Sequence, residues 1–190
     1  MTEYIKKISQ EFFPQGLTEI PQPPKELYVV GDLPDPTQFY YLAVVGSRKY
    51  TSYGREATER IISGLSGYPI CIVSGLAMGI DGIAHRAALD AGLPTVAVPG
   101  SGLDRTIIYP RSHVNLAREI VDNGGALLSE FEPTLTAAPW TFPQRNRIMA
   151  GLCQGVLIVE AEEQSGTLIT ARLALDYNRN VFTIPGSIFS

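Results

Sequence analysis

The sequence predicts an α/β fold with a doubly wound, mostly parallel sheet of the extended Rossmann-like kind. Four short apolar runs rich in Val and Ile support this prediction, because such runs are typical of strands buried on both faces. They lie at residues 41–45, 70–73, 95–98 and 156–159. Each run ends in a loop containing Gly or Ser that leads toward a helical stretch. Alternating strands and helices indicate right-handed βαβ units.

Residues 1–38 differ from the rest and are expected to form an extended arm lying against the domain. Proline fixes φ and cannot donate to a strand ladder, and this stretch contains Pro14, Pro21, Pro23, Pro24, Pro34 and Pro36. Residues 26–30 are expected to form a short edge strand. Residues 39–190 then form one Rossmann-like domain, long enough to bury a sizeable core.

Helical periodicity follows the predicted strands. In residues 53–66, Ile61, Ile62 and Leu65 share one face. Residues 80–91 repeat this pattern, and Gly92 follows as a C-cap. Further helices are expected at residues 113–123, 146–152 and 167–177, and further strands at 126–128 and 181–184.

Composition excludes several classes of protein. With 45% hydrophobic residues the chain is too apolar for disorder, and no apolar run reaches the roughly 18 residues of a membrane helix. The N-terminus lacks the apolar core of a signal peptide, and Cys71 and Cys153 are expected to be free thiols, so we expect a cytoplasmic protein. No metal-ligand spacing surrounds the cysteines or His85 and His113, and no metal or cofactor is expected. His113 is expected to cap a helix.

The net charge of −4 weighs against a protein that coats nucleic acid by bulk charge. It leaves room for a local basic groove with few phosphate contacts and a moderate salt dependence. Short basic groups lie beside the loops, namely Arg48, Lys49 and Arg55, then Arg111 and Arg118, then Arg145 and Arg147.

The first loop, Gly46-Ser47-Arg48, has the residue types of a phosphate site. Glycine permits close approach of a ligand, serine offers a hydroxyl, and arginine presents a two-pronged donor. The alternative is a tight turn whose arginine faces solvent. The loop contains neither a G-x-G-x-x-G fingerprint nor a Walker A motif, so it is not a dinucleotide or P-loop site of those kinds.

Two further loops combine serine and glycine. Ser74 and Gly75 precede Asp81, which is expected to cap its helix rather than to act in catalysis. For these loop amides, ligand binding and a purely structural role both stay open. Ser101 and Gly102 lie in a loop so dense in glycine that ligand binding is favoured.

The most distinctive run is Arg145-Asn146-Arg147 at a proline-marked helix start, with Trp140 and Phe142 close by. Basic side chains beside exposed aromatic rings suit single-stranded nucleic acid, because phosphates take the charge and bases stack on rings. The alternative is that the aromatic residues are core and the arginines pair with Glu130 or Glu160. Both interpretations can hold for different residues.

The last loop opens a helix with Ser165-Gly166-Thr167, whose hydroxyl and amide groups suit a cap or a phosphate. Glu160 stands at a strand end, where a general base is conceivable. No nucleophile or partner base accompanies it in the sequence. An ion pair with Arg145 or Arg147 is therefore favoured, and no catalytic residue is assigned.

Taken in order, these motifs resemble the DNA-processing protein A family (DprA/Smf) over residues 13–187. The matching blocks are Gly46-Ser47-Arg48, residues 74–81, Pro99-Gly100-Ser101-Gly102-Leu103-Asp104 with Tyr109-Pro110, Ser129-Glu130, residues 142–152, and Val159-Glu160-Ala161 with residues 165–171. Six ordered blocks make chance similarity improbable. Unlike many members, the sequence shows no helical domain before the arm and no winged helix at its end, and residues 131–139 depart from the family's glycine-containing loop.

The resemblance implies a non-enzymatic homodimer that binds single-stranded DNA, protects incoming strands in natural transformation and assists loading of the RecA recombinase. No membrane partner is implied. Carried over by motif, the phosphate pocket falls on Ser47, Arg48, Ser74, Gly75, Ser101, Gly102, Ser165, Gly166 and Thr167, with Arg145, Asn146 and Arg147 near it.

A small-nucleotide enzyme or sensor of the phosphoribohydrolase type is the rival hypothesis. Those proteins carry a Pro-Gly-Gly-x-Gly-Thr loop followed by a glutamate. Here Ser101 occupies the third position and Leu103 follows Gly102, so the threonine is missing. The rival then rests on the general fold alone, which is a weak argument for function. A degenerate module that makes only protein contacts is the third alternative.

Overall fold

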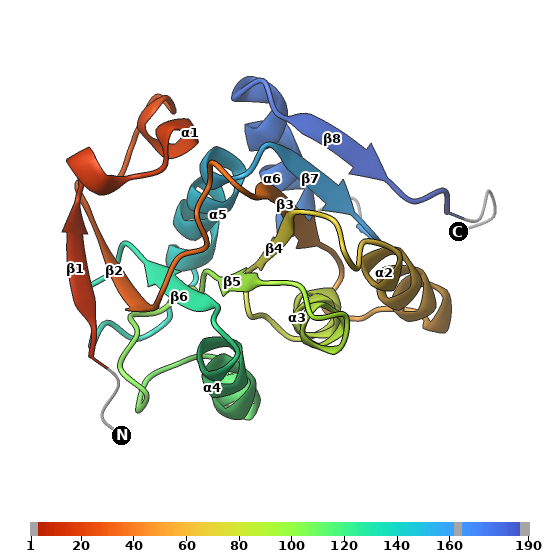
Figure 1. The fold of residues 1–190 in the computed structure, drawn as a ribbon, viewed down its shortest axis with the longest axis horizontal. Helices are drawn as coiled ribbons and strands as arrows, with labels where there is room; N and C mark the ends of the chain where they lie inside the picture. Colours follow the sequence, from red (N-terminus) through yellow and green to blue (C-terminus); the bar gives the residue numbers. More distant parts are fainter. Residues whose placement is uncertain (1–3, 162–164, 187–190) are drawn as a thin grey trace.

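A computed structural model describes residues 4–161 and 165–186 and contains a sheet of eight strands (Figure 1). The strand order is β1-β2-β6-β5-β4-β3-β7-β8. The strands are β1 (Lys6–Ser9), β2 (Glu26–Gly31), β3 (Tyr40–Val45), β4 (Ile70–Ser74), β5 (Thr95–Ala97), β6 (Ala126–Ser129), β7 (Gly155–Ile158) and β8 (Asn180–Thr183). All pairs from β6 to β8 are parallel, so the predicted mostly parallel α/β sheet is confirmed.

Helices cover both faces of this sheet (Figure 1). They are α1 (Gln15–Thr18), α2 (Ser52–Gly64), α3 (Ile80–Asp90), α4 (Val114–Asp122), α5 (Thr141–Leu152) and α6 (Gly166–Asp176), with 3-10 helices η1 (Gln10–Phe12) and η2 (Arg111–His113). Successive side chains of a strand point to opposite faces. Val44 therefore joins the core beneath α2 and α3, whereas Val45 joins the core shared with α1, α5 and α6.

The N-terminal segment is built into the sheet, and it is not an extended arm throughout. β2 pairs antiparallel with both β1 and β6, so the prediction that residues 26–30 form an edge strand is wrong. The four central side chains of β2, Leu27 to Val30, are all buried. An apolar strand of this kind is stable when both of its faces are packed and both of its edges are paired. The prolines fall in the connections, where a missing N–H costs no ladder bond. The domain boundary at residue 38 stays a prediction.

Helix α5 begins five residues earlier than residue 146, at Thr141. Pro143 lies in its first turn, where backbone N–H groups have no partner within the helix, so proline does not interrupt it. The earlier start places Phe142, Arg145 and Met149 on the same helix. This arrangement matters for the site described below.

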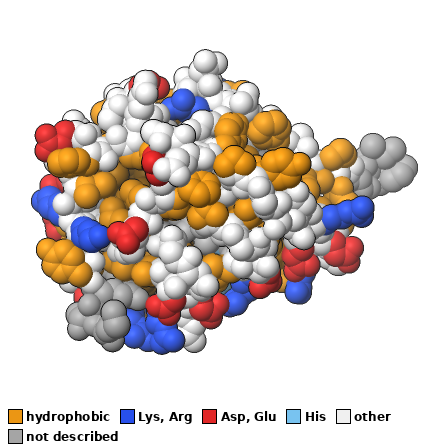
Figure 2. Space-filling model, viewed as in Figure 1, with side chains coloured by type: hydrophobic (Ala, Val, Ile, Leu, Met, Phe, Trp, Pro, Cys, Tyr) orange, Lys and Arg blue, Asp and Glu red, His pale blue; other side chains and the backbone are white. Residues whose placement is uncertain are grey.

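The surface shows no excess of one charge on the face drawn in Figure 2, where basic and acidic side chains are interspersed. This agrees with the small net charge of −4. Among the described residues, no helix has the length and apolar character needed to cross a membrane.

Candidate anion-binding site

A pocket of about 290 Å³ lies where the loops after β3 and β7 meet the first turns of α5 and α6. β3 and β7 are neighbouring parallel strands, so their carboxyl ends open onto the same edge of the sheet. Eight of the predicted site residues line this pocket, namely Gly46, Ser47, Arg48, Arg145, Asn146, Ser165, Gly166 and Thr167. The other five, Ser74, Gly75, Ser101, Gly102 and Arg147, do not line it.

The loop after β3 presents Arg48 to solvent and turns Ser47 inward. Ser47 Oγ donates to Lys49 O at 2.8 Å and accepts from Lys49 N at 3.0 Å, so its side chain closes the turn. The Arg48 guanidinium lies over the Phe142 ring, 5.1 Å from its centroid. Arg48 takes part in none of the ion pairs found among the described residues. Its charge is held in place by an aromatic ring and is open to an anion.

The wall opposite is the N-terminus of α6, an eleven-residue helix that starts at Gly166. Ser165 is its N-cap, yet the Ser165 side chain makes no cap hydrogen bond. Ser165 Oγ is buried and has no hydrogen-bond partner in the described part of the chain. The first N–H groups of a helix also lack partners within it and carry a partial positive charge. This wall therefore offers several donors that an anion can satisfy.

Arg145 forms the buried base of the pocket and is only 5% exposed. Its Nη1 donates to Gly75 O at 2.6 Å and also to Val98 O, and its Nε donates to Asn146 Oδ1 at 3.1 Å. Burial lowers the guanidinium pKa to about 10, with nearby Asp81 opposing this shift. Arg145 therefore stays charged at neutral pH and raises the positive potential in the pocket.

Gly75 is wedged between Arg145 and Asp81. A Cβ added to Gly75 would overlap Arg145 Nη1 and would lie 2.5 Å from Asp81 Oδ2. Asp81 Oδ2 accepts from Gly75 N at 3.1 Å and from Ala77 N at 3.4 Å. Burial raises the pKa of this carboxyl, and the Arg145 charge opposes the rise. The prediction that Asp81 caps its helix is therefore wrong, because Gly79 is the N-cap of α3 and Asp81 binds amides of the preceding loop. Asp81 also lines the pocket, paired with the Arg145 charge.

In the loops after β4 and β5 the predicted donors are already engaged by protein carbonyls. Ser74 Oγ donates to Val44 O at 2.6 Å, and Ser101 Oγ donates to Gly102 O at 3.0 Å. Gly102 N donates to Leu135 O at 2.8 Å. Ser74 and Ser101 are fully buried. These donors already have protein partners, in contrast to Ser165.

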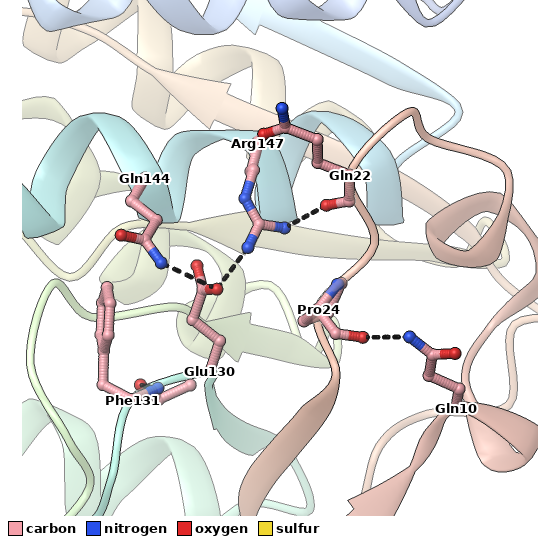
Figure 3. Close-up of polar contacts among 8 residues, drawn as sticks. Gln10, Gln22, Pro24, Glu130, Phe131, Gln144 and Arg147 are labelled. Carbon is pink, nitrogen blue, oxygen red and sulfur yellow. Dashed lines mark hydrogen bonds and ion pairs between the residues drawn. The ribbon is translucent and has the colours of Figure 1, made fainter.

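Arg147 does not line the pocket, and its side chain joins three segments (Figure 3). Its Nη2 contacts Glu130 Oε2, its Nη1 donates to Gln22 O at 2.7 Å, and Gln144 Nε2 donates to the same carboxylate at 3.1 Å. Burial raises the pKa of Glu130, and the Arg147 charge opposes this. The predicted alternative of an arginine–Glu130 pair is therefore confirmed for Arg147.

The predicted Glu160 pairing is wrong, and the predicted His113 cap holds only for its position. Glu160 pairs with neither arginine, because its carboxylate accepts from Thr51 N at 3.0 Å and from Thr51 Oγ1 at the start of α2. His113 is the N-cap residue of α4, as predicted, but its side chain makes no cap hydrogen bond, and its Nδ1 lies 2.8 Å from Leu76 O instead. Both groups meet partners from distant loops, which a local sequence pattern does not reveal.

The two aromatic residues differ from each other. Trp140 is 56% exposed and contacts Phe131 edge-on, with ring centroids 5.7 Å apart. Phe142 is half-buried between Arg48 and Tyr109, whose ring centroid is 5.9 Å away. Neither is a plain core residue, so the core interpretation fails for Trp140 and holds only in part for Phe142.

Sequence reasoning missed Met149 and Thr170, which also line the pocket. Both stand four residues after predicted site residues on the same helix, Arg145 and Gly166, so helical spacing was an available signal. Asn146 connects these two helices, because its Nδ2 donates to Gly166 O at 3.2 Å. The pocket thus lies at the contact between α5 and α6.

The described residues contain no group of three side chains suited to hold a metal ion. Cys71 and Cys153 are buried free thiols, as predicted. Burial raises the pKa of both, which makes them poor nucleophiles at neutral pH. What the arrangement offers chemically is a set of fixed donors for one anionic group.

Comparison with known proteins gives a consistent result. The family described as DNA recombination-mediator protein A matches residues 5–190. Protein Smf of Escherichia coli is 44% identical over 178 residues, which cover 94% of this chain and 47% of that protein. The chain therefore spans about half the length of this relative.

Two solved structures have the same fold. DNA processing protein A from Streptococcus pneumoniae superposes with a TM-score of 0.89 at 41% identity, covering all of this chain and 66% of that one. DNA processing protein A from Helicobacter pylori, whose structure was described for its single-stranded DNA binding mode, gives 0.87 at 31% identity, covering 99% and 85%.

Proposed function

The chain belongs to the DNA recombination-mediator protein A family, and we propose that it binds single-stranded DNA through one backbone phosphate held in the pocket. The Helicobacter pylori relative supports the ligand class, because its structure concerns single-stranded DNA binding. The pocket supports the anchoring group. A phosphodiester has two unesterified oxygens, which suit the donors on the two facing walls.

One observation carries this proposal, namely that Ser165 Oγ at the start of α6 is buried and has no partner among the residues that the structure describes. A buried hydroxyl without a partner costs free energy, about 1–3 kcal/mol. A phosphate oxygen accepting from Ser165 and from the first amides of α6 removes that cost. Arg48 then approaches the same phosphate from the opposite wall as a two-pronged donor.

Single-stranded DNA fits better than duplex DNA because of what surrounds the pocket. Phe142 and Tyr109 lie in edge contact beside Arg48, and Tyr109 and Trp140 are exposed. Unstacked bases bind to such rings with little sequence preference. With few basic residues at the pocket, the salt dependence of binding should be moderate.

The wider role is part of the same proposal and rests on the family. It comprises protection of incoming strands in natural transformation, assistance to the RecA recombinase, a homodimer, and action in the cytoplasm. We propose binding without catalysis, since Glu160 is engaged by Thr51 and both cysteines are buried. The phosphoribohydrolase-like alternative is disfavoured because Ser101 Oγ and Gly102 N already donate to the carbonyls of Gly102 and Leu135.

The test is fluorescence anisotropy of a labelled oligothymidylate at several salt concentrations, beside duplex DNA and free nucleotides. Arg48→Ala should weaken single-strand binding by about tenfold or more, the value of a charge-assisted hydrogen bond. Its stability should change little, because Arg48 is exposed. Arg60→Ala is the matched control, as Arg60 is an exposed arginine of α2 outside the pocket. Tight nucleotide binding without single-strand affinity would sink the proposal.

A further inference from the structure

We propose that the bound strand leaves the phosphate pocket across Tyr109, where one base stacks, and that Arg105 and Arg111 hold the backbone beyond it. This inference rests on the proposed function and adds a second contact site to it. The site lies in the loop between β5 and α4, outside the pocket residues. It also gives the direction in which the strand runs along the edge of the sheet.

Continuity with the pocket is the first argument. The Arg48 guanidinium rests on Phe142, and Phe142 meets Tyr109 edge-on at an interplanar angle of 61°. Phe142 is itself fixed, because it packs against Gly100, where an added Cβ would lie 2.7 Å from Phe142 Cδ1. A row of three groups in contact, Arg48, Phe142 and Tyr109, therefore runs outward from the pocket.

Tyr109 is suited to hold a base. It is 46% exposed, although it is a large aromatic residue. Its hydroxyl makes no hydrogen bond within the described residues. Phe142 braces the ring, so stacking a base on it costs little additional side-chain entropy.

Two arginines flank Tyr109 in the same loop, Arg105 four residues before it and Arg111 two residues after it. Arg111 Nη1 donates to Arg105 O at 3.0 Å and to Thr106 O at 2.7 Å, which fixes the guanidinium while its other nitrogens have no partner in the described chain. Arg105 and Arg111 are exposed and enter no ion pair there. The loop's carboxylate, Asp104, accepts from Thr106 N at 2.8 Å and Thr106 Oγ1 at 2.6 Å. An anionic backbone is the complementary ligand.

The opposite direction is less favourable. A groove of about 880 Å³ adjoins the other side of the pocket and shares Ser47 and Lys49 with it. Its wall includes the Glu160 carboxylate, which repels phosphate. Its exposed ring, Tyr53, uses its hydroxyl to donate to Pro185 O at 2.8 Å. Substitutions of Tyr109 and Tyr53, one on each side of the pocket, can therefore show in which direction the DNA strand leaves it.

The experiment compares Tyr109→Ala, Tyr109→Phe and Tyr53→Ala on oligothymidylates of about 4 and about 20 nucleotides, the range covered by single-strand binding modules. Tyr109→Ala should weaken binding of the long strand by about fivefold or more and leave the short strand unchanged. Tyr109→Phe keeps the ring and should match the wild type on both. Tyr53→Ala should also match it.

The arginines have a separate readout. Arg105→Gln and Arg111→Gln should each lower the slope of log affinity against log salt by about 1 on the long strand. Arg60→Gln removes the same charge from α2 and should leave that slope unchanged. Arg105 makes no side-chain hydrogen bond in the described residues, so Arg105→Gln tests the charge even if Arg111→Gln disturbs the loop.

The outcomes separate this inference from the proposed function. The second site is overturned if Tyr109→Ala binds the long strand with wild-type affinity and both arginine variants keep the wild-type salt slope. Arg48→Ala tests the pocket independently of that result. A loss in Tyr53→Ala instead of Tyr109→Ala means that the strand runs the other way. Absence of any single-strand binding by the wild type overturns both proposals. Thermal unfolding of each variant checks that it is folded.

Discussion

Four loops at one edge of the sheet look alike in sequence but fall into two kinds. The loops after β3 and β7 contribute Arg48 and Ser165 to a pocket and are here called open, because Ser165 Oγ has no hydrogen-bond partner within residues 4–161 and 165–186. The loops after β4 and β5 are closed, because Ser74 and Ser101 donate to backbone carbonyls and lie fully buried. Serine and glycine after a buried strand therefore indicate close packing as readily as an anion site.

The closed loops still serve the open ones. Gly75 O holds the Arg145 guanidinium, and Asp81 holds the amide of the same glycine. Arg145 in turn contacts Asn146, which donates to Gly166 O at the start of α6. The difference between the two kinds is thus between residues that contact an anion and residues that hold those contacts in place.

The largest expected effect is on the closed side, in Gly75→Ala. The added methyl group overlaps Arg145 and crowds Asp81, two buried charged groups that cannot move without losing their hydrogen bonds. We expect a loss of about 3 kcal/mol or more in the free energy of unfolding, measured by urea denaturation. Single-strand binding should fall with it.

Gly64→Ala is the matched control. Gly64 ends α2, has open space around its Cα, and does not have a left-handed backbone conformation. This change should leave stability unchanged or raise it by up to about 1 kcal/mol. If both variants lose equal stability, the loss in Gly75→Ala comes from the backbone conformation of glycine and not from the clash with Arg145 and Asp81.

The next effect concerns pH and His85, which is buried beside the closed loops. Thr95 Oγ1 donates to Ile72 O, so it accepts from His85 Nδ1–H at 2.8 Å, which leaves His85 Nε2 bare and without a partner in the described chain. Burial lowers the His85 pKa to about 3, and the nearby Arg145 charge acts in the same direction. The imidazole is therefore neutral in the folded protein.

The sign follows from proton binding. Below pH 6.5 the unfolded chain protonates this histidine while the folded protein does not, so stability present above pH 6.5 is lost as pH falls toward 3. Between pH 6.5 and 5 this amounts to about 2 kcal/mol. His85→Asn keeps a donor for Thr95 and should remove that part of the slope. An unchanged slope would show that His85 is charged in the folded protein.

The sheet and the positions of the loops at its edge could be predicted, because strands such as residues 41–45 are recognisable from their local composition. The place of β2 could not, since its partner β6 is far along the chain and no local pattern encodes that pairing. Likewise, nothing in the sequence distinguishes Arg145 from Arg147. Arg145 is buried against Gly75 and Asp81, whereas Arg147 pairs with Glu130. These neighbours come from elements that are distant in the sequence.

The smallest effects give the sharpest test of the comparison, in the matched variants Ser165→Ala and Ser74→Ala. Removing the unpartnered Ser165 Oγ should leave the free energy of unfolding unchanged or raise it by up to about 1 kcal/mol. Affinity for single-stranded DNA should fall about tenfold, because a hydrogen bond to a charged phosphate is lost.

Ser74→Ala should do the reverse. It deprives Val44 O of a buried donor and should cost about 1 kcal/mol of stability, with unchanged affinity. Urea denaturation and anisotropy are measured on both variants. Stability should fall only in Ser74→Ala, and affinity should fall only in Ser165→Ala. Equal behaviour of the variants would mean that open and closed loops are not functionally distinct. A loss of affinity in Ser74→Ala alone would move the anion to the β4 loop, where Asp81 already occupies the amides.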